Sequence, residues 1–388
     1  MTQLELGGAQ RVTLDLLRCQ AQAGWEVALI TGAEGLLLEE ARAQLGPRLL
    51  VEPALVRAIR PPRDLAALRG ITARLRRLRP DLVHTHSSKA GVLGRCAARL
   101  AGVSIVVHSV HGFSFQPAPY QSPMRRAFYL GLEKLVARWT TAFTCDSQAN
   151  RRVGEREQLF RHSRVEVIPS GVDLEPYRSA SADPAKRAEL GLAEGAPVVA
   201  MIACLKPQKA PLDYVAACAQ IARELPQAQF LLIGDGELRP AVESRVAAEG
   251  LQDRFHLLGW RHDLPELVPL IDVALLTSLW EGLPQTLPIV QAAGIPVVAT
   301  RVDGNAEAVL DGKTGFLVPA GDSTALAALA VRLLRDRELA RRLGSAGRDF
   351  AQRFDLKHTC ARVLELYDSL FAAAAPQSAS GRREWSGS

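Results

Sequence analysis

Residues 271–300 read IDVALLTSLWEGLPQTLPIVQAAGIPVVAT, and this stretch decides the fold class. The apolar runs 273–276 and 296–300 have the composition of buried parallel strands, and a helix is predicted between them. The loop after the first strand carries one carboxylate, Glu281, beside Gly282. Open α/β sheets bind ligands at the carboxyl ends of their strands, and helix N-termini hold anions. The stretch therefore predicts an α/β protein with an anion site in this loop.

The same stretch resembles a motif of the family 4 retaining glycosyltransferases (glycosyl transferases group 1), roughly E-G-x-P/G-x4-E-A-x-A-x-G-x-P-V-V-A. The matching positions are Glu281, Gly282, Pro284, Ala292, Ala293, Gly294, Pro296, Val297, Val298 and Ala299. The resemblance implies that Glu281 faces the donor sugar and that a second glutamate holds the nucleotide ribose. That second position is Ile289, which cannot accept a hydrogen bond. Gln285, one helical turn earlier on the same face, is the candidate replacement.

The resemblance extends from Gly7 to about Phe371 and implies the GT-B fold, in which two Rossmann-like domains with parallel sheets face a cleft. It further implies transfer of a sugar from a nucleotide diphosphate donor to an acceptor hydroxyl, with retention at the anomeric carbon. Cell-envelope or exopolysaccharide assembly is the expected setting, with a glycan or lipid-linked acceptor. The nucleotide-sugar is a co-substrate, so neither a cofactor nor a metal is expected.

Length and composition agree with this fold. The chain has 388 residues, of which 48% are hydrophobic and 23% charged, so two globular domains are expected. No run of 18 apolar residues occurs, and the first residues lack the pattern of a signal peptide. Six cysteines without a C-x-x-C motif favour reduced thiols over disulfides or a zinc ribbon. We therefore expect a cytoplasmic protein.

Helices and apolar strands alternate along both halves of the chain, which predicts parallel sheets covered on both faces. The predicted strands are 26–31, 81–86, 104–107, 142–145, 198–203, 229–233, 254–258, 273–276, 297–300 and 315–318. The predicted units are an N-terminal acceptor-side domain (1–175), a linker (176–197), a C-terminal nucleotide-sugar domain (198–356), a helix crossing back to the first domain (357–373) and a disordered tail (374–388).

The start of the chain departs from the pattern. A doubly wound domain opens with a strand that leads into its first glycine loop, but only MTQLEL precedes Gly7 and Gly8. We therefore expect the first strand of the N-terminal domain to be missing, either because the start site is placed too late or because the chain is a fragment. Its absence would leave two neighbouring strands unpaired and weaken the first half of the fold.

Several loops carry candidate ligand-binding residues. Gly7 and Gly8 precede a predicted helix and could admit a phosphate, although a plain turn explains them equally well. In the loop at 203–213, Lys209 matches a family lysine that neutralises the donor diphosphate. The family arginine falls at Cys204, and Lys206 could supply its charge.

The backbone amides near Gly282 and Leu283 complete the predicted diphosphate site. The dinucleotide, P-loop and nucleophile-elbow motifs are absent, which counts against nicotinamide, flavin, P-loop and serine-hydrolase enzymes.

Four histidines follow two predicted strands: His84, His86, His108 and His111. Their imidazoles could ligate a metal, but no carboxylate or cysteine stands at partner spacing, so hydrogen-bonded structural histidines are the alternative. His111 precedes a glycine, as does the family histidine that contacts the donor. We therefore assign His111 and Glu281 as the catalytic candidates.

The net charge of +6 and the pI of 9.1 raise the question of an anionic partner. No RNA-stacking motif accompanies the basic residues, so nucleic acid is not expected. One predicted helix carries Arg74, Arg76, Arg77 and Arg79, and another carries Arg125, Arg126, Lys134 and Arg138. The second also holds Met124, Phe128 and Tyr129, so it is either a membrane-contacting helix or a solvated basic face with core aromatics.

The predicted mechanism is attack on the same face of the sugar from which the diphosphate departs, because no second carboxylate is placed to act as a nucleophile. A diphosphate oxygen would then take the acceptor proton. Three rivals remain open at this point. The first is a nucleotide-sugar epimerase with Glu281 and His111 as its acid–base pair, and the second is a degenerate binding protein, suggested by Ile289 and Cys204. The third is a nucleic-acid binder, suggested by the pI alone.

Overall fold

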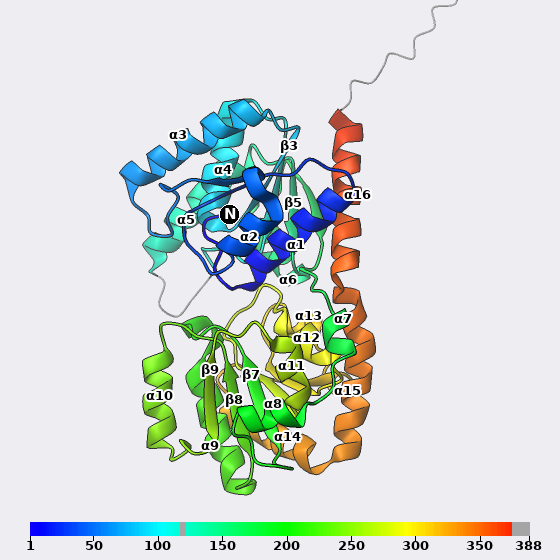
Figure 1. Cartoon of the computed structure of the whole chain (residues 1–388). Helices are drawn as coiled ribbons and strands as arrows, with labels where there is room; N and C mark the ends of the chain where they lie inside the picture. The colour runs from blue at the N-terminus through cyan, green and yellow to red at the C-terminus, as the bar shows by residue number, and fades with distance from the viewer. Residues whose placement is uncertain (117–121, 375–388) are drawn as a thin grey trace, which may run out of the picture.

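The computed structural model describes residues 1–116 and 122–374 and contains two α/β domains stacked end to end (Figure 1). The C-terminal domain is built on one parallel sheet with the strand order β12-β11-β10-β7-β8-β9. Its strands are β7 (Val198–Ile202), β8 (Gln229–Ile233), β9 (Phe255–Gly259), β10 (Val273–Leu276), β11 (Val297–Thr300) and β12 (Gly315–Val318). All six strands were predicted, because strands covered on both faces are apolar throughout.

Helices cover both faces of this sheet and bury the largest hydrophobic core of the molecule. They are α9 (Pro211–Glu224), α10 (Arg239–Ala248), α11 (Leu264–Leu267), α12 (Thr286–Ala292), α13 (Asn305–Ala308), α14 (Ser323–Arg335) and α15 (Arg337–Ala351). Two short helices, α7 (Glu175–Arg178) and α8 (Pro184–Glu189), lie in the segment that precedes β7. The sequence anticipated one surface helix there.

The N-terminal domain has its strands in two separate parallel sheets. The smaller contains β1 (Leu29–Thr31) and β2 (Leu49–Val51), and the larger contains β3 (Leu82–His86), β4 (Ile105–Val110), β5 (Ala142–Cys145) and β6 (Arg164–Val167). The helices are α1 (Gly8–Gln22), α2 (Leu38–Leu45), α3 (Pro61–Leu78), α4 (Ser88–Ala101), α5 (Pro123–Ala137) and α6 (Gln148–Arg156). The larger sheet has the order β3-β4-β5-β6, and no hydrogen-bonded pair joins it to β1-β2 in the described residues.

A cavity of about 460 Å³ separates the two N-terminal sheets and is lined by residues of β1 and β3, among them Ile30 and Val83. In the C-terminal domain, the corresponding place between β8 and β10 is occupied by β7. Met1 also lines the cavity, and its amino group donates to the Ile30 carbonyl at 3.0 Å. The prediction that the described N-terminal domain lacks its first strand is confirmed.

The long helix α16 (Leu356–Ala374) follows α15 and packs along the N-terminal domain (Figure 1). Its Val363 and Leu366 share a core with Val12 and Leu16 of α1, so the predicted crossing helix is confirmed. The predicted disordered tail lies, apart from Ala374, outside the described residues. Among the described residues, no helix is long and apolar enough to span a bilayer.

The chain passes between the domains twice, and the two crossings lie side by side. Val172 in the first crossing pairs in parallel with Asp355 in the second. The Val172 N–H donates to the Phe354 carbonyl at 3.1 Å, and the Leu356 N–H donates to the Val172 carbonyl at 3.0 Å. Backbone hydrogen bonds therefore join the two crossings directly.

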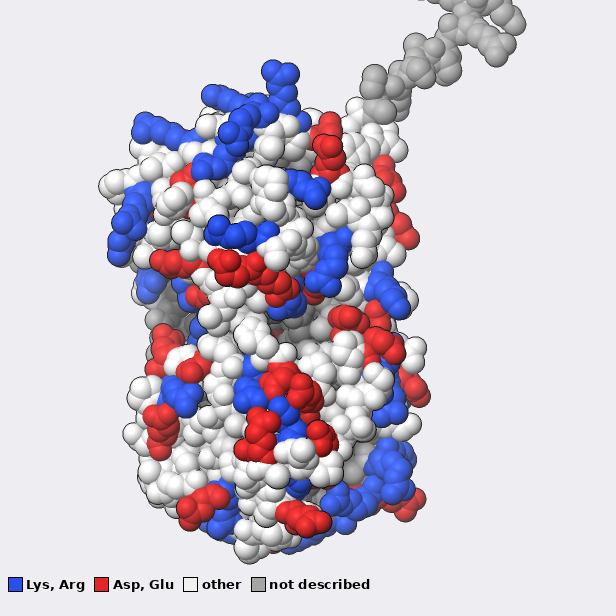
Figure 2. Space-filling model, in the orientation of Figure 1, with Lys and Arg blue, Asp and Glu red and all other residues white. Residues whose placement is uncertain are grey.

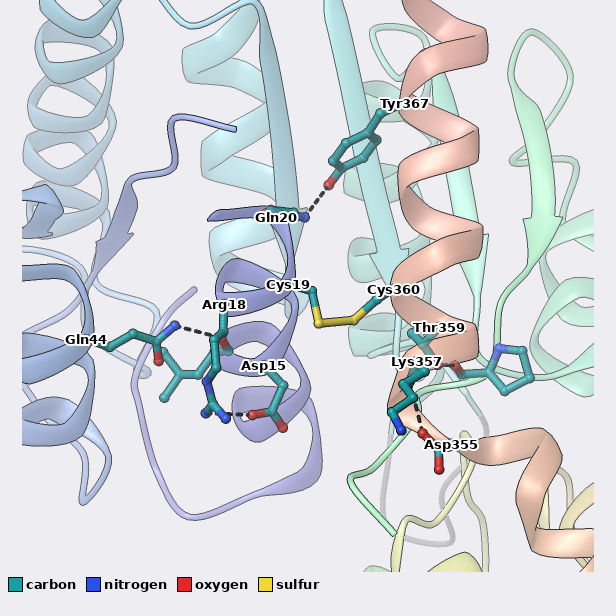
Figure 3. The surroundings of a disulfide bond; sticks show 12 residues. Asp15, Arg18, Cys19, Gln20, Gln44, Asp355, Lys357, Thr359, Cys360 and Tyr367 are labelled. Carbon is teal, nitrogen blue, oxygen red and sulfur yellow. Dashed lines mark hydrogen bonds and ion pairs between the residues drawn. A yellow bond between two sulfur atoms is a disulfide. The ribbon is translucent and has the colours of Figure 1, made fainter. Parts of the chain in front are cut away.

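The expectation that every cysteine is a free thiol is wrong. Cys19 on α1 and Cys360 on α16 form a disulfide, with their Cα atoms 6.1 Å apart (Figure 3). Beside it, the Gln20 amide donates to the Tyr367 hydroxyl at 3.1 Å. The two cysteines are 341 positions apart, so no local spacing motif could indicate the pair. The free thiols are Cys96, Cys145, Cys204 and Cys218.

Reduction of this disulfide is expected to lower the free energy of unfolding by about 2–4 kcal/mol, since a cross-link that closes a long loop restricts the unfolded chain. Thermal melting with and without dithiothreitol measures the effect. Cys19→Ser should melt at the lower temperature under both conditions, whereas Cys96→Ser should keep its sensitivity to the reductant. Equal melting temperatures for the untreated and reduced parent protein would contradict the prediction.

Candidate active site

Glu281 follows β10 at the carboxyl edge of the C-terminal sheet and is only 4% exposed. Its carboxylate accepts a hydrogen bond from the Ser278 hydroxyl at 2.6 Å and forms an ion pair with the Lys209 ammonium group. Its backbone N–H donates to the Asp303 carboxylate at 3.1 Å. The carboxylate is therefore buried, charge-compensated and fixed in orientation.

The two predicted diphosphate lysines lie in the loop after β7, which neighbours β10 in the sheet. Lys209 reaches Glu281, while the Lys206 ammonium lies 3.8 Å from the Glu5 carboxylate of the N-terminal domain. Cys204, at the position of the family arginine, is a half-buried free thiol. The loop thus places two cations at the junction of the domains, where Figure 2 shows the surface hollowed.

The loop at Gly282 packs directly against the N-terminal domain. A Cβ atom added to Gly282 would lie 2.2 Å from the backbone carbonyl oxygen of His111. A Cβ added to Gly304 would lie 1.9 Å from the Gly282 carbonyl oxygen, so this loop is enclosed from two sides. The neighbouring Leu283 is buried. The structure therefore brings the two catalytic candidates, His111 and Glu281, to adjacent positions across the cleft.

A second contact joins the glycine pair to α12. Gly7 caps α1 and Gly8 begins it, and a Cβ at Gly8 would lie 2.9 Å from the Gln285 amide oxygen. The Gln285 amide nitrogen donates to the Gly171 carbonyl at 3.2 Å. Ile289 is buried in the C-terminal core, which an aliphatic side chain suits. Gln285, rather than Ile289, is therefore the polar side chain at this part of the cleft.

His111 follows β4 and is held by neighbours from two adjoining strands. Its Nδ1 lies 2.9 Å from the Asp146 carboxylate, and its Nε2 lies 3.1 Å from Nδ1 of His86. The Ser170 hydroxyl lies 3.5 Å from the same Nδ1. Asp146, which follows β5, was missed by the sequence analysis because no motif marks it. Its place at the end of the neighbouring strand is the signal that could have indicated it.

Burial by itself would lower the pKa of His111, but the charge and hydrogen bond of Asp146 outweigh it and raise the pKa above its ordinary value. For the other strand-end histidines burial is the largest cause, and neighbouring positive charges lower the pKa further. Burial lowers the pKa of His84 to about 3 and that of His86 well below its ordinary value. His111 is consequently the histidine of this group that most readily carries a proton.

The histidine nitrogens have protein partners in most cases. His84 contacts the Tyr367 hydroxyl at 2.5 Å and the Ser109 hydroxyl at 2.8 Å, and His108 contacts the Thr85 hydroxyl at 2.9 Å. Within residues 1–116 and 122–374, no group of three or more His, Cys, Asp or Glu side chains is arranged to hold a metal ion. These contacts favour hydrogen-bonded histidines over the metal site that the sequence left open.

Glu307 makes a domain contact that the sequence analysis did not anticipate. Ser147 caps α6, and the first amides of that helix, at Gln148 and Ala149, each donate to the Glu307 carboxylate at 2.8 Å. A carboxylate at a helix N-terminus is stabilised by the unpaired amides and the helix dipole. Glu307, on α13 of the C-terminal domain, thus binds α6 of the N-terminal domain.

Comparison with known proteins fits this architecture. The family model described as glycosyltransferase family 4 matches residues 6–176, and the model described as glycosyl transferases group 1 matches residues 182–350. A galactosyltransferase of Escherichia coli that acts on UDP-Gal and α-D-GlcNAc-diphosphoundecaprenol is 34% identical over 86% of each chain. The chain belongs to glycosyltransferase family 4. A second relative of this family 4 glycosyltransferase, the putative glycosyltransferase EpsD of Bacillus subtilis, is 29% identical over 79% of the chain and 81% of the relative.

Solved structures share the fold. Sucrose-phosphate synthase from Thermosynechococcus elongatus superposes with a TM-score of 0.82 at 25% identity, covering 95% of this chain and 94% of its own. The Anabaena protein HepE, solved with UDP and glucose, has a TM-score of 0.79 at 24% identity, covering 94% and 97%. The predicted GT-B fold and glycosyltransferase activity are therefore confirmed, and the epimerase alternative is not supported.

Proposed function

We propose that this family 4 glycosyltransferase transfers a hexose from a UDP-sugar to a hydroxyl group of a lipid diphosphate-linked sugar, with retention, during cell-envelope or exopolysaccharide assembly. The observation that carries the proposal is the ion pair of Glu281 and Lys209, which faces the N-terminal domain beside Gly282 and His111. The E. coli relative, named for a UDP-Gal donor and a diphosphoundecaprenol-linked acceptor, supports this choice of substrates.

Each charged group in the cleft has a task in this reaction. Lys209 and Lys206 would neutralise the departing diphosphate, and Glu281, released from Lys209 by the incoming phosphate, would accept hydrogen bonds from the sugar hydroxyls. The bond from the anomeric carbon to the diphosphate breaks while the acceptor oxygen bonds to the same face. The acceptor proton passes to a diphosphate oxygen. Two lysines supply the charge, so we propose a reaction without metal or other cofactor.

The direct test is a transfer assay with UDP-Gal, UDP-Glc, GDP-mannose and ADP-glucose, using a GlcNAc-diphospholipid acceptor with and without EDTA. We expect turnover with a UDP-sugar, an α-linked product by NMR, and no loss in EDTA. Turnover only with another nucleotide would overturn the donor assignment, and a β-linked product would overturn retention. Binding of UDP-sugar without turnover on any lipid-linked acceptor would instead favour the degenerate protein suggested by Ile289 and Cys204.

We further propose that α5 rests on the inner, cytoplasmic face of an anionic membrane. Met124, Phe128 and Leu135 lie on one stripe of this helix, and their exposed fractions are 82%, 53% and 45%. The basic residues Arg125, Lys134 and Arg138 are exposed beside them. Phe128 is thus not the core aromatic of the alternative interpretation, although Tyr129 does pack against the core.

Further basic side chains lie at another part of the same domain. Figure 2 shows Lys and Arg side chains gathered at the end of the N-terminal domain that lies away from the cleft. Arg76, Arg77 and Arg79 at the end of α3 are exposed. Exposed basic side chains near an anionic surface contribute about 1 kcal/mol each to membrane binding, and the apolar stripe supplies the part that salt does not screen.

Replacing Met124 and Phe128 together by serine is expected to reduce binding to vesicles of phosphatidylglycerol and phosphatidylethanolamine by about tenfold or more, because each buried apolar side chain contributes about 1.5–3 kcal/mol. Vesicle sedimentation measures this binding. Leu310→Ser, at an exposed leucine of the C-terminal domain, is the matched control and should bind like the parent. Equal binding by the double variant and the parent would contradict a membrane role for α5.

A further inference from the structure

His86, which is buried, and His111, whose side chain is 13% exposed, form a pair at the carboxyl ends of two neighbouring strands, β3 and β4. Their rings are nearly parallel, with an angle of 19° between planes, and the contact joins Nδ1 of His86 to Nε2 of His111 at 3.1 Å. Two imidazole nitrogens at this distance can hold one hydrogen between them, since two N–H groups would clash and two lone pairs would repel. The pair therefore shares a single proton at this contact.

The surroundings decide which ring carries it. Asp146 accepts from Nδ1 of His111 at 2.9 Å, which places a hydrogen on that atom. A carboxylate also stabilises a positive charge on the ring it contacts. His86 has no carboxylate partner in the described structure, and His84 stacks against its other face with ring centroids 4.3 Å apart. Charge on the pair is thus favoured on His111 and disfavoured on His86.

The charged and titratable groups that face the pair can be named. They are Asp146 after β5, His84 on β3, His108 on β4 and the amino group of Met1. His84 is held in place by Ser109 and Tyr367, so it cannot turn towards His111. Of these groups, Asp146 is the one carboxylate, and the pKa of His111 is raised while that of His86 is lowered.

We propose that His86 is a positioning residue: its Nδ1 accepts the Nε2 hydrogen of a protonated His111, so that His111 meets the donor as a fixed cation rather than as a hydrogen-bond acceptor. The proposal rests on the proposed UDP-sugar function, because the backbone of His111 abuts the Glu281–Gly282 loop at the expected donor site. Both of its ring N–H groups are engaged by Asp146 and His86, so the cation would act on the departing diphosphate through its charge alone, in addition to Lys206 and Lys209. The sign follows from the raised pKa: the charge is present below that pKa, and donor binding weakens as the pH rises through it.

The first test needs no donor. In protein labelled with ¹⁵N-histidine, at a pH equal to the ordinary pKa of histidine, we expect both ring nitrogens of His111 to be mainly protonated and one nitrogen of His86 to be unprotonated. A neutral His111 at that pH would overturn the proposal. The spectrum is recorded without substrate, so a failed transfer assay would leave this test of the His86–His111 pair unaffected.

The second test uses two substitutions. His86→Asn keeps an acceptor oxygen near the position of Nδ1, and His86→Phe removes it. We expect His86→Phe to shift the titration of His111 to lower pH and to weaken UDP-Gal binding near neutral pH by about tenfold, since a charge-assisted hydrogen bond is lost. His86→Asn should retain the titration.

His108→Asn is the matched control, because this buried histidine bonds to Thr85 and not to His111. In this variant, the titration of His111 and the binding of UDP-Gal should match those of the parent. An unchanged pH profile in folded His86→Phe would overturn the proposal, as would equal losses in the asparagine and phenylalanine variants of His86. Melting curves check that each variant is folded.

Discussion

Replacing Lys209 by alanine is expected to lower kcat by about 10²-fold or more, because one cation that stabilises the departing diphosphate in a closed site contributes on this scale. The loss should appear in kcat as well as in KM, since charge on the diphosphate increases as the bond to the sugar breaks. Steady-state kinetics with UDP-Gal and a lipid-linked acceptor measures both. Glu281 would keep its Ser278 hydrogen bond, so the loop should retain its conformation.

Lys313→Ala provides the control for this prediction. Lys313 is an exposed lysine in the turn before β12, at the opposite edge of the sheet from the candidate site. Its removal changes the net charge by the same amount but should leave kcat at the parent value. Equal activity of Lys209→Ala and Lys313→Ala would show that Lys209 does not act on the diphosphate, and the proposed site would be wrong.

Replacing Gly282 by alanine is expected to lower kcat/KM by a similar factor through geometry alone. The added methyl group would lie 2.2 Å from the His111 carbonyl oxygen, so the domains could not approach as closely as they do here. A misplacement of about 1 Å in a reacting complex can cost about 10²-fold in rate. The atoms nearest to the added Cβ belong to His111 and Asn150 of the N-terminal domain and not to the packing of its own domain, so the melting temperature should change little.

Gly131→Ala is the matched control for Gly282→Ala. Gly131 lies within α5, and a Cβ added there meets no atom within 4 Å. Alanine is favoured over glycine in a helix by about 1 kcal/mol, so this variant should be at least as stable as the parent and fully active. Full activity in Gly282→Ala would mean that the contact seen between Gly282 and His111 is not needed for catalysis.

The predictability of each element depended on how much of its structure is local. Strands β8, β10, β11 and β12 were predicted with the bounds observed, because they are almost wholly apolar, and Gly234, Pro296 and Pro319 flank three of them. The helix α2 and the three-residue strand β2 were missed, because short elements contain too few residues for a periodic pattern.

The residues of the candidate site were likewise predictable only where the interactions that place them are local to one sheet. Lys209 and Glu281 could be placed together from the sequence, because their loops follow strands that pair in one sheet. Asp146 was missed although the same rule applies to it, since it follows the strand next to that of His111. Glu307 could not be placed, because its partners belong to the other domain. The disulfide was mispredicted for the same reason: Cys19 and Cys360 meet only when α16 packs along α1.

The paired crossings at Val172 and Asp355 constrain how the two domains can move. Because backbone hydrogen bonds join them, the domains share one narrow axis of rotation at this edge and cannot slide freely past each other. Gln285 bonds to Gly171 next to that axis, so this part of the donor side is displaced least when the domains turn. The opposite edge travels furthest. A bulky acceptor of the proposed lipid-linked kind would therefore find its widest entrance there, and a nucleotide bound beside Gln285, as the sequence predicts, would stay in place.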